Sequence, residues 1–455
     1  MGRVGRGVAA GCLVAAGCAQ VFGIDSPNEV AGSDASSDSI APDATGGSEG
    51  GGQDATSDVT GDSPASVETG SSSGADSSSS GKDSGSHEGG DGAVVCTPAS
   101  QQCTGAGNLS TCNSVTGQLV TSLCATAACS GNSCAGSTAG NPNLSCQATG
   151  PGLTDCGADC CCTSDEVPEG TYYRTYTNAG GGPTGEGDPA TVTGFRLDKY
   201  LVTVGRFRQF VEAGPASFAP AAGSGKHTHL NGGQGLADSS STTGAYEPGW
   251  LTADDAHIAP TDTNLNCVAG WSTWTPTAGT QENLPINCVN WWEAYAFCIW
   301  DGGFLPSEAE WEYAAAGGSA QREYPWGATD PGTMNKYAIY SLLPPDGGPA
   351  GCYYPNGPVS CSGAANIAPV GTADLGGGLW GQLDLGGEVV EWTLDWYGNY
   401  ATSCTDCAYV SGGTNRVARG GLFNWTTTNL LPPTRPYEPP STRVPGTGFR
   451  CARKP

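Results

Sequence analysis

The sequence predicts an α+β domain that is rich in loops and contains few, short helices and strands. Glycine accounts for 72 of the 455 residues and charged residues for only 14%, a composition that favours loops over a helical bundle. Residues 285–318 contain two short helical patterns separated by glycines. Residues 194–204 read as a strand that runs into a helix start. Together these patterns predict a mixed domain over residues 163–455.

The two helices within 285–318 are predicted from their first turns. Asn290 and Glu293 have the spacing of a capping box, and Ser307 and Glu310 repeat it after Pro306. Glycines follow each helix, as expected at a C-terminus. The apolar face of the first helix carries Trp291, Tyr295 and Cys298, and that of the second carries Trp311, Ala314 and Ala315.

Residues 1–18 resemble a bacterial export signal. A positive start precedes a short apolar run, too short to span a bilayer as a helix. Residues 15–18 read Ala-Ala-Gly-Cys, which resembles a lipoprotein signal and implies lipidation of Cys18. The alternative is an ordinary signal peptide with an incidental cysteine. Since Ala19 follows, sorting rules for such signals favour an outer-membrane lipoprotein of the cell envelope.

Residues 19–93 are predicted to be a disordered tether made mainly of Ser, Gly and Asp. They contain too little apolar surface to offset the entropy of ordering a chain. Residues 25–92 hold fourteen acidic residues and one lysine, so they carry −13 of the net charge of −26. A chain this acidic is not expected to bind nucleic acid.

Residues 94–162 are predicted to be a segment held together by disulfides. The chain has 21 cysteines and four histidines, which indicates an oxidising compartment rather than structural zinc. Few large apolar residues accompany the cysteines, so a hydrophobic core is not expected there. An alternative for Cys160–Cys162 is metal binding. Eleven cysteines lie in the segment: Cys96, Cys103, Cys112, Cys124, Cys129, Cys134, Cys146, Cys156, Cys160, Cys161 and Cys162.

The main domain resembles the formylglycine-generating enzyme, or sulfatase-modifying factor, family, which implies a C-type-lectin-like fold. The resemblance begins in residues 292–314, which include Leu305-Pro306 and Glu310-Trp311-Glu312-Tyr313; Phe304 stands where the family usually has Arg. It continues in motifs that read Tyr324-Pro325-Trp326-Gly327, Asp384–Tyr397, Arg416–Gly421 and Gly448–Cys451. These residues are mostly structural, so they indicate fold more strongly than chemistry.

The family's chemistry is not expected here. Its enzyme converts a sulfatase cysteine to formylglycine with oxygen and copper, and two thiols after the Arg-Gly-Gly motif suit Cu(I). The resemblance places those thiols at Trp425 and Leu430. Copper is therefore not expected. The C-x-x-C at Cys404 and Cys407 is either a redox pair or a short structural disulfide.

The sequence contains candidate ligands for two other metals. The resemblance implies a structural calcium site within residues 384–391, with ligands at Asp384, Gly387, Val389 and Glu391. A second calcium site would begin at Asn335 and the Lys336 carbonyl. Iron at His227 and His229 is an alternative, because residues two apart on a strand face the same side; His257 is distant. The resemblance also implies a disulfide between Cys298 and Cys451.

The function favoured by these observations is binding. An exported, lipid-anchored member without the thiol pair would bind a protein or carbohydrate ligand. Aromatic candidates for a cleft are Trp271, Trp274, Trp425 and Tyr437, although core packing is the alternative role for each. The competing functions are a formylglycine-generating oxidase and an iron-dependent oxidoreductase.

Overall fold

The computed structural model describes residues 101–455 except 105–107, 113–118, 124–128, 131–132, 135–143, 158, 215–218, 343–350 and 402, and describes side chains from residue 144 onward. The predicted signal, with Cys18, and the predicted tether at 19–93 lie outside the described residues. Within the described part, no helix is both long and apolar enough to cross a membrane.

The helices are short, and α4 and α5 begin at the predicted caps, whereas α3 was not predicted. The α-helices are α2 (Val204–Glu212), α3 (Asp262–Leu265), α4 (Trp291–Trp300) and α5 (Glu308–Ala316). Both predicted capping boxes are present, from Asn290 to Glu293 and from Ser307 to Glu310. Gly317 ends α5 at φ 67°, a backbone conformation that glycine adopts without strain. The 3-10 turns are η2 (Leu144–Cys146), η4 (Asn231–Gly233), η5 (Thr252–His257), η6 (Gly318–Ala320), η7 (Ala364–Asn366) and η8 (Thr427–Asn429).

The strands form several small sheets rather than one large sheet. One four-stranded sheet joins β18 (Tyr437–Glu438), β17 (Arg416–Arg419), β14 (Val390–Trp396) and β19 (Thr447–Gly448). A second joins β15 (Cys404–Thr405), β8 (Pro183–Val192) and β7 (Gly170–Asn178). The remaining small sheets pair β10 (Ala237–Asp238) with β16 (Cys407–Ala408), β11 (Ser341–Leu342) with β12 (Gly351–Cys352) and β13 (Val359–Ser360), and β4 (Cys129–Ser130) with β5 (Ser133–Cys134).

The largest sheet crosses the boundary predicted between residues 162 and 163. Its order is β1 (Gln101–Thr104), β2 (Asn108–Cys112), β3 (Leu119–Leu123), β6 (Ser164–Val167), β9 (Phe195–Asp198) and β20 (Ala452–Arg453). In it, β3 of the Cys-rich segment pairs with β6 of the main domain. The two predicted units therefore share hydrogen-bonded strands.

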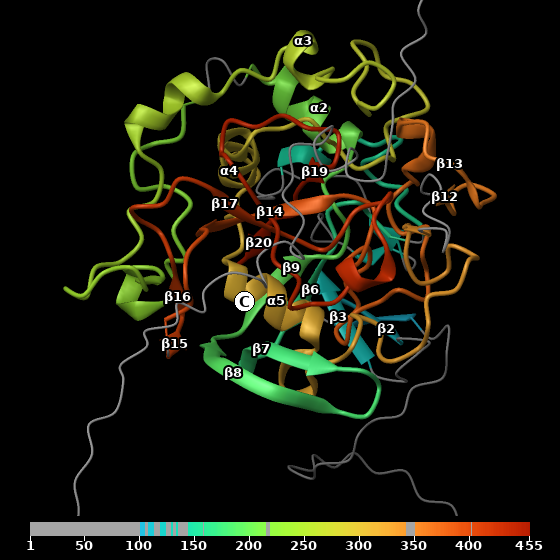
Figure 1. Cartoon of the computed structure of the whole chain (residues 1–455). Coiled ribbons are helices and arrows are strands. Elements are labelled where there is room, and N and C mark those ends of the chain that lie inside the picture. Colours follow the sequence, from blue (N-terminus) through green and yellow to red (C-terminus); the bar gives the residue numbers. More distant parts are fainter. Residues whose placement is uncertain are drawn as a thin grey trace, which may run out of the picture. The chain divides into compact units, whose positions relative to one another are not determined.

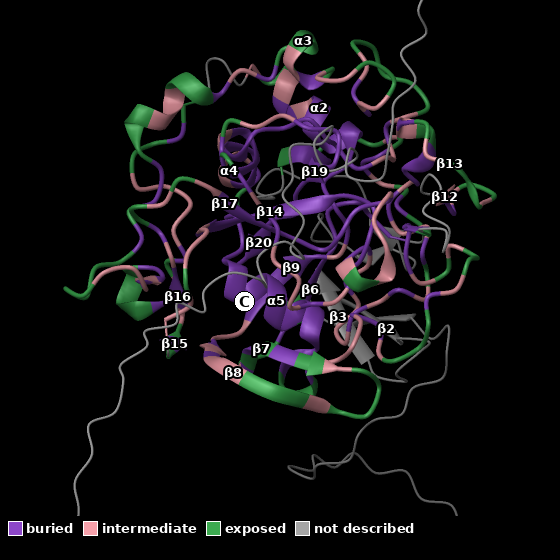
Figure 2. Ribbon diagram, in the orientation of Figure 1, coloured by how far each residue is buried: buried purple, intermediate pink, exposed green. Residues whose placement is uncertain are grey.

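The core is organised around α4 and α5. All nine residues of α5 are buried, and the helix contacts the β7–β8 hairpin on one side and β14 and β17 on another (Figures 1 and 2). The aromatic side chains of α4 pack with those of α2, with Phe207 and Phe297 stacked at 5.7 Å. Cys298 of α4 is bonded to Cys451, the pair that the family resemblance implies. That bond closes a loop of 153 residues around the core.

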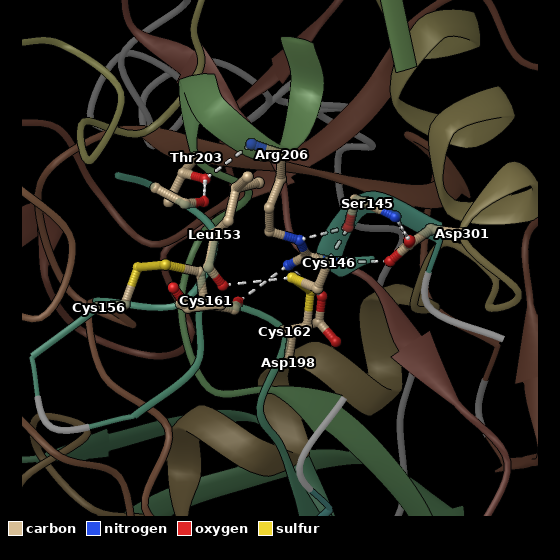
Figure 3. The surroundings of a disulfide bond; sticks show 12 residues. Ser145, Cys146, Leu153, Cys156, Cys161, Cys162, Asp198, Thr203, Arg206 and Asp301 are labelled. Atoms are coloured by element: carbon tan, nitrogen blue, oxygen red, sulfur yellow. Dashed lines mark hydrogen bonds and ion pairs between the residues drawn. A yellow bond between two sulfur atoms is a disulfide. The ribbon is translucent and has the colours of Figure 1, made fainter. Parts of the chain in front are cut away.

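Residues 144–162 are built into the main domain through Arg206 of α2 (Figure 3). This fully buried guanidinium donates to Ser145 Oγ at 3.0 Å and to the Cys161 carbonyl at 3.2 Å. It also pairs with Asp198 and Asp301, at 2.9 and 2.8 Å. Two disulfides, Cys146–Cys162 and Cys156–Cys161, hold the segment in this position.

Candidate functional site

The positions of the family's two thiols are occupied by packed apolar side chains. Leu430 is 1% exposed and lies in a cluster with Trp326, Tyr340 and Tyr353. Trp425 is half-buried against a neighbouring core cluster, and its carbonyl accepts a hydrogen bond from the Ser341 amide. All thirteen cysteines with described side chains are disulfide-bonded. The side chains described from residue 144 onward therefore offer no thiolate to Cu(I), and copper does not fit this site.

The C-x-x-C motif forms a buried disulfide. Cys404 and Cys407 are bonded to each other and lie 4% and 6% exposed, within the core cluster around α5. Cys404 belongs to β15 and Cys407 to β16, so the bond ties two small sheets together. A thiol pair that reacts with substrates is normally accessible, so this position favours the structural role.

Of the two carboxylates predicted to bind calcium, Asp384 has a free oxygen atom and Glu391 is engaged by an arginine. Asp384 is 4% exposed, and its Oδ1 has no hydrogen-bond donor among the described residues. Burial raises the pKa of Asp384 to about 6. Gly387 and Val389 follow in a tight turn, with Gly387 at φ 93°. Glu391, in contrast, accepts two hydrogen bonds from Arg450, at 2.6 and 2.9 Å.

The start of the second predicted calcium site also contains an unpaired oxygen. Asn335 Oδ1 is buried without a donor among the described residues, while its Nδ2 donates to the Tyr353 carbonyl. The Lys336 carbonyl accepts a hydrogen bond from the Leu375 amide at 2.8 Å. Asn335 therefore keeps one free ligand atom, and Lys336 is engaged in the backbone.

The two histidines predicted as an iron pair are not arranged for metal binding. His227 is fully buried, with Nδ1 3.1 Å from Glu247 and Nε2 3.0 Å from Glu310. Burial opposes the charged form, but Glu310 and Glu247 outweigh it and raise the pKa of His227 to about 10. An imidazolium has no lone pair for a metal. Across the described residues, no group of three or more His, Cys, Asp or Glu side chains is placed to hold a metal ion, so iron does not fit.

The two other described histidines, His229 and His257, have aromatic neighbours. His229 stacks on Phe304 at 5.6 Å, and Phe304 also lies 3.9 Å from the ring of His227. Phe304 is the residue that replaces the family's usual arginine, and a second cation against the His227 imidazolium would be repelled. His257 stacks on Trp292 at 3.8 Å.

The aromatic residues proposed from the sequence do not gather in one cleft. Trp274 is buried with the Arg208 guanidinium 4.3 Å from its ring, and the ring of Tyr437 packs against that of Tyr397 at 4.1 Å in a tilted arrangement. Trp271 and Trp425 pack against the same core cluster. Each therefore has a packing role, which was the alternative for these residues.

A different set of aromatic side chains lines a cavity of about 330 Å³ beside the start of α4. The helix places Trp291, Trp292 and Tyr295 on its wall, because positions i and i+4 share one helical face and Trp292 lies beside them. Strand β14 adds Trp396, and β17 adds Arg416. The principal wall residues are Trp291, Trp292, Tyr295, Trp396, Arg416 and Asp254.

Arg416 is the central charged group of this cavity. It is the cross-strand partner of Trp396, so the β14–β17 register sets their contact. The guanidinium lies 3.5 Å from the ring of Trp396 and 3.6 Å from that of Trp291. Both faces of the cation are therefore covered by indole rings, a favourable arrangement for a desolvated arginine. Burial lowers the pKa of Arg416 to about 9, with Asp395, Tyr295 and Asp254 opposing the shift.

The cavity wall continues into the buried hydrogen bonds of α5. Glu247 lines the cavity, and its Oε1 accepts from the His227 and Leu236 amides. Through His227 it is linked to Glu310, the third residue of α5. These interactions fix the loop that carries Glu247 against helix α5.

A separate buried network surrounds Arg419 of the Arg-Gly-Gly motif. Its Nη2 donates to Glu308 at 2.5 Å and to Glu312 at 2.8 Å. Burial would raise the pKa of Glu308, but Arg435 and Arg419 outweigh it and hold the value at about 2. Burial raises the pKa of Glu312 to about 8, against the opposing influence of Arg419. The Arg-Gly-Gly motif thus anchors β17 to α5.

Comparison with known proteins gives consistent matches over the main domain. A family model described as "Sulfatase-modifying factor enzyme 1-like domain" matches residues 165–455. The chain is 32% identical over 268 residues to the formylglycine-generating enzyme of Streptomyces coelicolor, covering 57% of this chain and 77% of that protein. It is 28% identical over 311 residues to "Inactive C-alpha-formylglycine-generating enzyme 2" of Mus musculus, covering 62% and 83%. Among solved structures, PvdO from Pseudomonas aeruginosa aligns over 68% of this chain and 100% of its own, with 20% identity and a TM-score of 0.40.

Proposed function

Because residues 165–455 belong to the family of sulfatase-modifying factor enzyme 1-like domains, we propose that this member binds a ligand or partner and does not carry out thiol-dependent oxidation. The observation that carries the proposal is the pair Trp425 and Leu430, two packed apolar side chains at the thiol positions. A relative of Mus musculus is named inactive, so family members without the activity have a precedent.

The aromatic cavity beside α4 is the proposed binding site. It combines apolar ring surfaces with a few polar groups, which is the usual composition of small-molecule sites. The proposed ligand is a carbohydrate or a segment of a partner protein. The cavity lies on α4, β14 and β17 and does not include Trp425 or Leu430.

The test of this function is the reaction of the family's enzyme. The full-length protein is incubated with copper, oxygen and a peptide that contains Cys-x-Pro-x-Arg, with the Streptomyces coelicolor enzyme as positive control. We expect the peptide mass to stay unchanged with this protein and to show replacement of the thiol by an aldehyde in the control. Conversion of the peptide by this protein would establish the competing function, a formylglycine-generating oxidase.

The proposed location is the cell envelope, through a lipid on Cys18 and most consistent with the outer membrane. The thirteen cysteines whose side chains are described are all disulfide-bonded, which supports an oxidising compartment. Fatty-acid labelling of the protein in cells tests the anchor, and C18A is expected to abolish both labelling and membrane recovery. Labelling that persists in C18A would contradict this part of the proposal.

Calcium is proposed as a structural ion at Asp384, with the carbonyls of Gly387 and Val389 as further ligands. The unpaired, buried Asp384 Oδ1 supports it, and hard oxygen donors in a tight turn suit this ion. The iron-dependent oxidoreductase is the second competing function. His227 does not support it, since both of its ring nitrogens are engaged with carboxylates.

A further inference from the structure

Arg416 is a buried cation that the described part of the chain does not neutralise. It is 7% exposed, and no described carboxylate forms a salt bridge with it. Its hydrogen bond from Nη1 goes to the Leu394 carbonyl at 2.5 Å, and Nε is buried without an acceptor among the described residues. Among the described residues, five other buried arginines lie on carboxylates, namely Arg206, Arg208, Arg419, Arg450 and Arg453, whereas buried Arg174 donates to the Asp188 and Ala401 carbonyls.

The two carboxylates in the cavity wall are already engaged elsewhere. Glu247 accepts hydrogen bonds from the His227 imidazolium and from backbone amides. Asp254 is half-buried, and its Oδ1 accepts from Trp292 Nε1 at 3.0 Å. Because the faces of the Arg416 guanidinium are covered by Trp291 and Trp396, only its edge is left for an acceptor. The edge of a guanidinium is the part that matches a carboxylate.

The other residues of the cavity wall indicate which kind of anion would bind beside Arg416. A cavity of about 330 Å³ accommodates one or two sugar rings, and its indole surfaces suit the apolar face of a pyranose. Ser411 and Asp254 supply polar atoms for hydroxyl groups. The residues outside 25–92 carry −13 of the net charge of −26, which opposes a highly charged polymer, so one carboxylate on a sugar is favoured over a sulfated chain.

We propose that this cavity binds an acidic sugar of the hexuronate class, with its carboxylate on Arg416 and its ring against the cavity's indoles. This proposal rests on the binding function proposed above and specifies its ligand. Arg416 makes the site prefer a sugar with a carboxylate over a neutral sugar, and the tryptophans provide the apolar surface against which a pyranose ring would pack.

The experiment measures binding of sodium glucuronate to the full-length protein by calorimetry and by tryptophan fluorescence, with glucose and benzoate as comparison ligands. We expect glucuronate to bind at least about tenfold more tightly than either, since a charged hydrogen-bonded pair contributes roughly a factor of 10 or more. R416M should weaken glucuronate binding by about tenfold or more. R322M is the control, because Arg322 is half-buried, donates one hydrogen bond to a backbone carbonyl, that of Pro325, and lies outside the cavity.

A second variant keeps the test decisive if R416M does not fold. D254N removes a negative charge from the wall and keeps an oxygen for Trp292, so glucuronate should bind about two- to fivefold more tightly while the weak binding of glucose is unchanged. Equal binding of glucose and glucuronate, absence of glucuronate binding, or tighter binding of benzoate would each overturn the uronate assignment. None of these results bears on the peptide oxidation assay, so failure here is distinguishable from failure of the proposed function.

Discussion

The His227 imidazole lies 3.0 Å from Glu310, the residue that closes the capping box of α5. Its other nitrogen lies 3.1 Å from Glu247, which lines the aromatic cavity. Glu310 also accepts from the Ser307 amide and hydroxyl, at 2.8 and 2.9 Å. The imidazolium therefore joins the cavity wall to the first turn of a fully buried helix.

Substitution H227Q is expected to change how stability depends on pH. The pKa of His227 is about 10 in the folded state, against an ordinary value of 6.5. At pH values between the two, the folded protein holds a proton on His227 that the unfolded chain has released. Its stabilising contribution is complete below pH 6.5 and is lost as the pH rises toward about 10. The difference in unfolding free energy between wild type and H227Q should shrink over that window, as measured by denaturant titrations at several pH values.

The comparison with H227Q is needed because other buried groups titrate in the same range. Burial raises the pKa of Glu312 to about 8 and that of Asp395 to about 7. These contributions are common to both proteins and cancel in the difference. H257Q, at an exposed histidine, is the control. A wild-type advantage that stays constant from pH 6.5 to 10 would show that His227 is not held as an imidazolium.

Substitutions E308Q and E312Q are expected to differ strongly at pH 7 although both residues contact Arg419. Glu308, with a pKa of about 2, is ionised and pairs with Arg419 and Arg435, so its loss should cost about 3–5 kcal/mol. Glu312, with a pKa of about 8, is mostly neutral, and a glutamine should cost no more than about 1 kcal/mol. Urea denaturation of the three proteins measures both values. Equal losses would contradict the assignment of charge within this network.

Calcium is expected to stabilise the protein through Asp384. Binding to the folded state alone stabilises by about 2.7 kcal/mol when the ligand is at 100 times its dissociation constant. The midpoint of thermal unfolding should therefore rise with added calcium, fall with a chelator, and cease to respond in D384N. D330N, at an exposed aspartate, should respond as wild type. A midpoint independent of calcium in the wild type would leave the Asp384 oxygen as an unsatisfied buried atom.

Features with local patterns were predictable from the sequence, and features built across the chain were not. The capping boxes at Asn290 and Ser307 depend on residues three apart, and both are present. The family resemblance likewise follows contiguous motifs and is confirmed over residues 165–455. The cavity instead joins α4 to a cross-strand pair more than 100 residues later, Trp396 and Arg416. No spacing within one segment predicts that contact, and Trp291 had the periodicity of an ordinary core residue.

The junction at residue 162 illustrates the same limit. The low apolar content of residues 94–162 suggested a separate segment held together by disulfides alone. The segment docks through polar contacts of Ser145 and the Cys161 carbonyl to Arg206 and through Cys156 and Cys161, which lie in a core cluster with Tyr200. Hydrophobicity along the sequence could not indicate this docking, because the buried groups are cysteines and polar atoms. Gly152 and Gly205 also approach closely: a Cβ on Gly205 would lie 2.6 Å from the Pro151 carbonyl oxygen.

Removal of residues 1–162 is therefore expected to destabilise the main domain, whereas removal of 1–143 should leave the docked segment in place. The protein that lacks residues 1–162 loses the Ser145 hydroxyl and the Cys161 carbonyl, which accept hydrogen bonds from Arg206. It also loses the Gly152 carbonyl, which accepts from the Thr203 hydroxyl. At about 1 kcal/mol for each hydrogen bond, with exposure of the buried guanidinium in addition, its unfolding free energy should fall by about 3 kcal/mol or more. Denaturant unfolding of the two truncated proteins measures the difference.

Substitution G205A gives this prediction an internal control, because its sign should depend on whether residues 144–162 are present. Gly205 lies in the first turn of α2, where alanine favours the helix by up to about 1 kcal/mol over glycine. In the protein that keeps residues 144–162, the new Cβ would collide with the Pro151 carbonyl, so G205A should destabilise. Without those residues the collision is absent and G205A should stabilise. The same sign in both backgrounds would mean that the segment does not rest on α2 in solution.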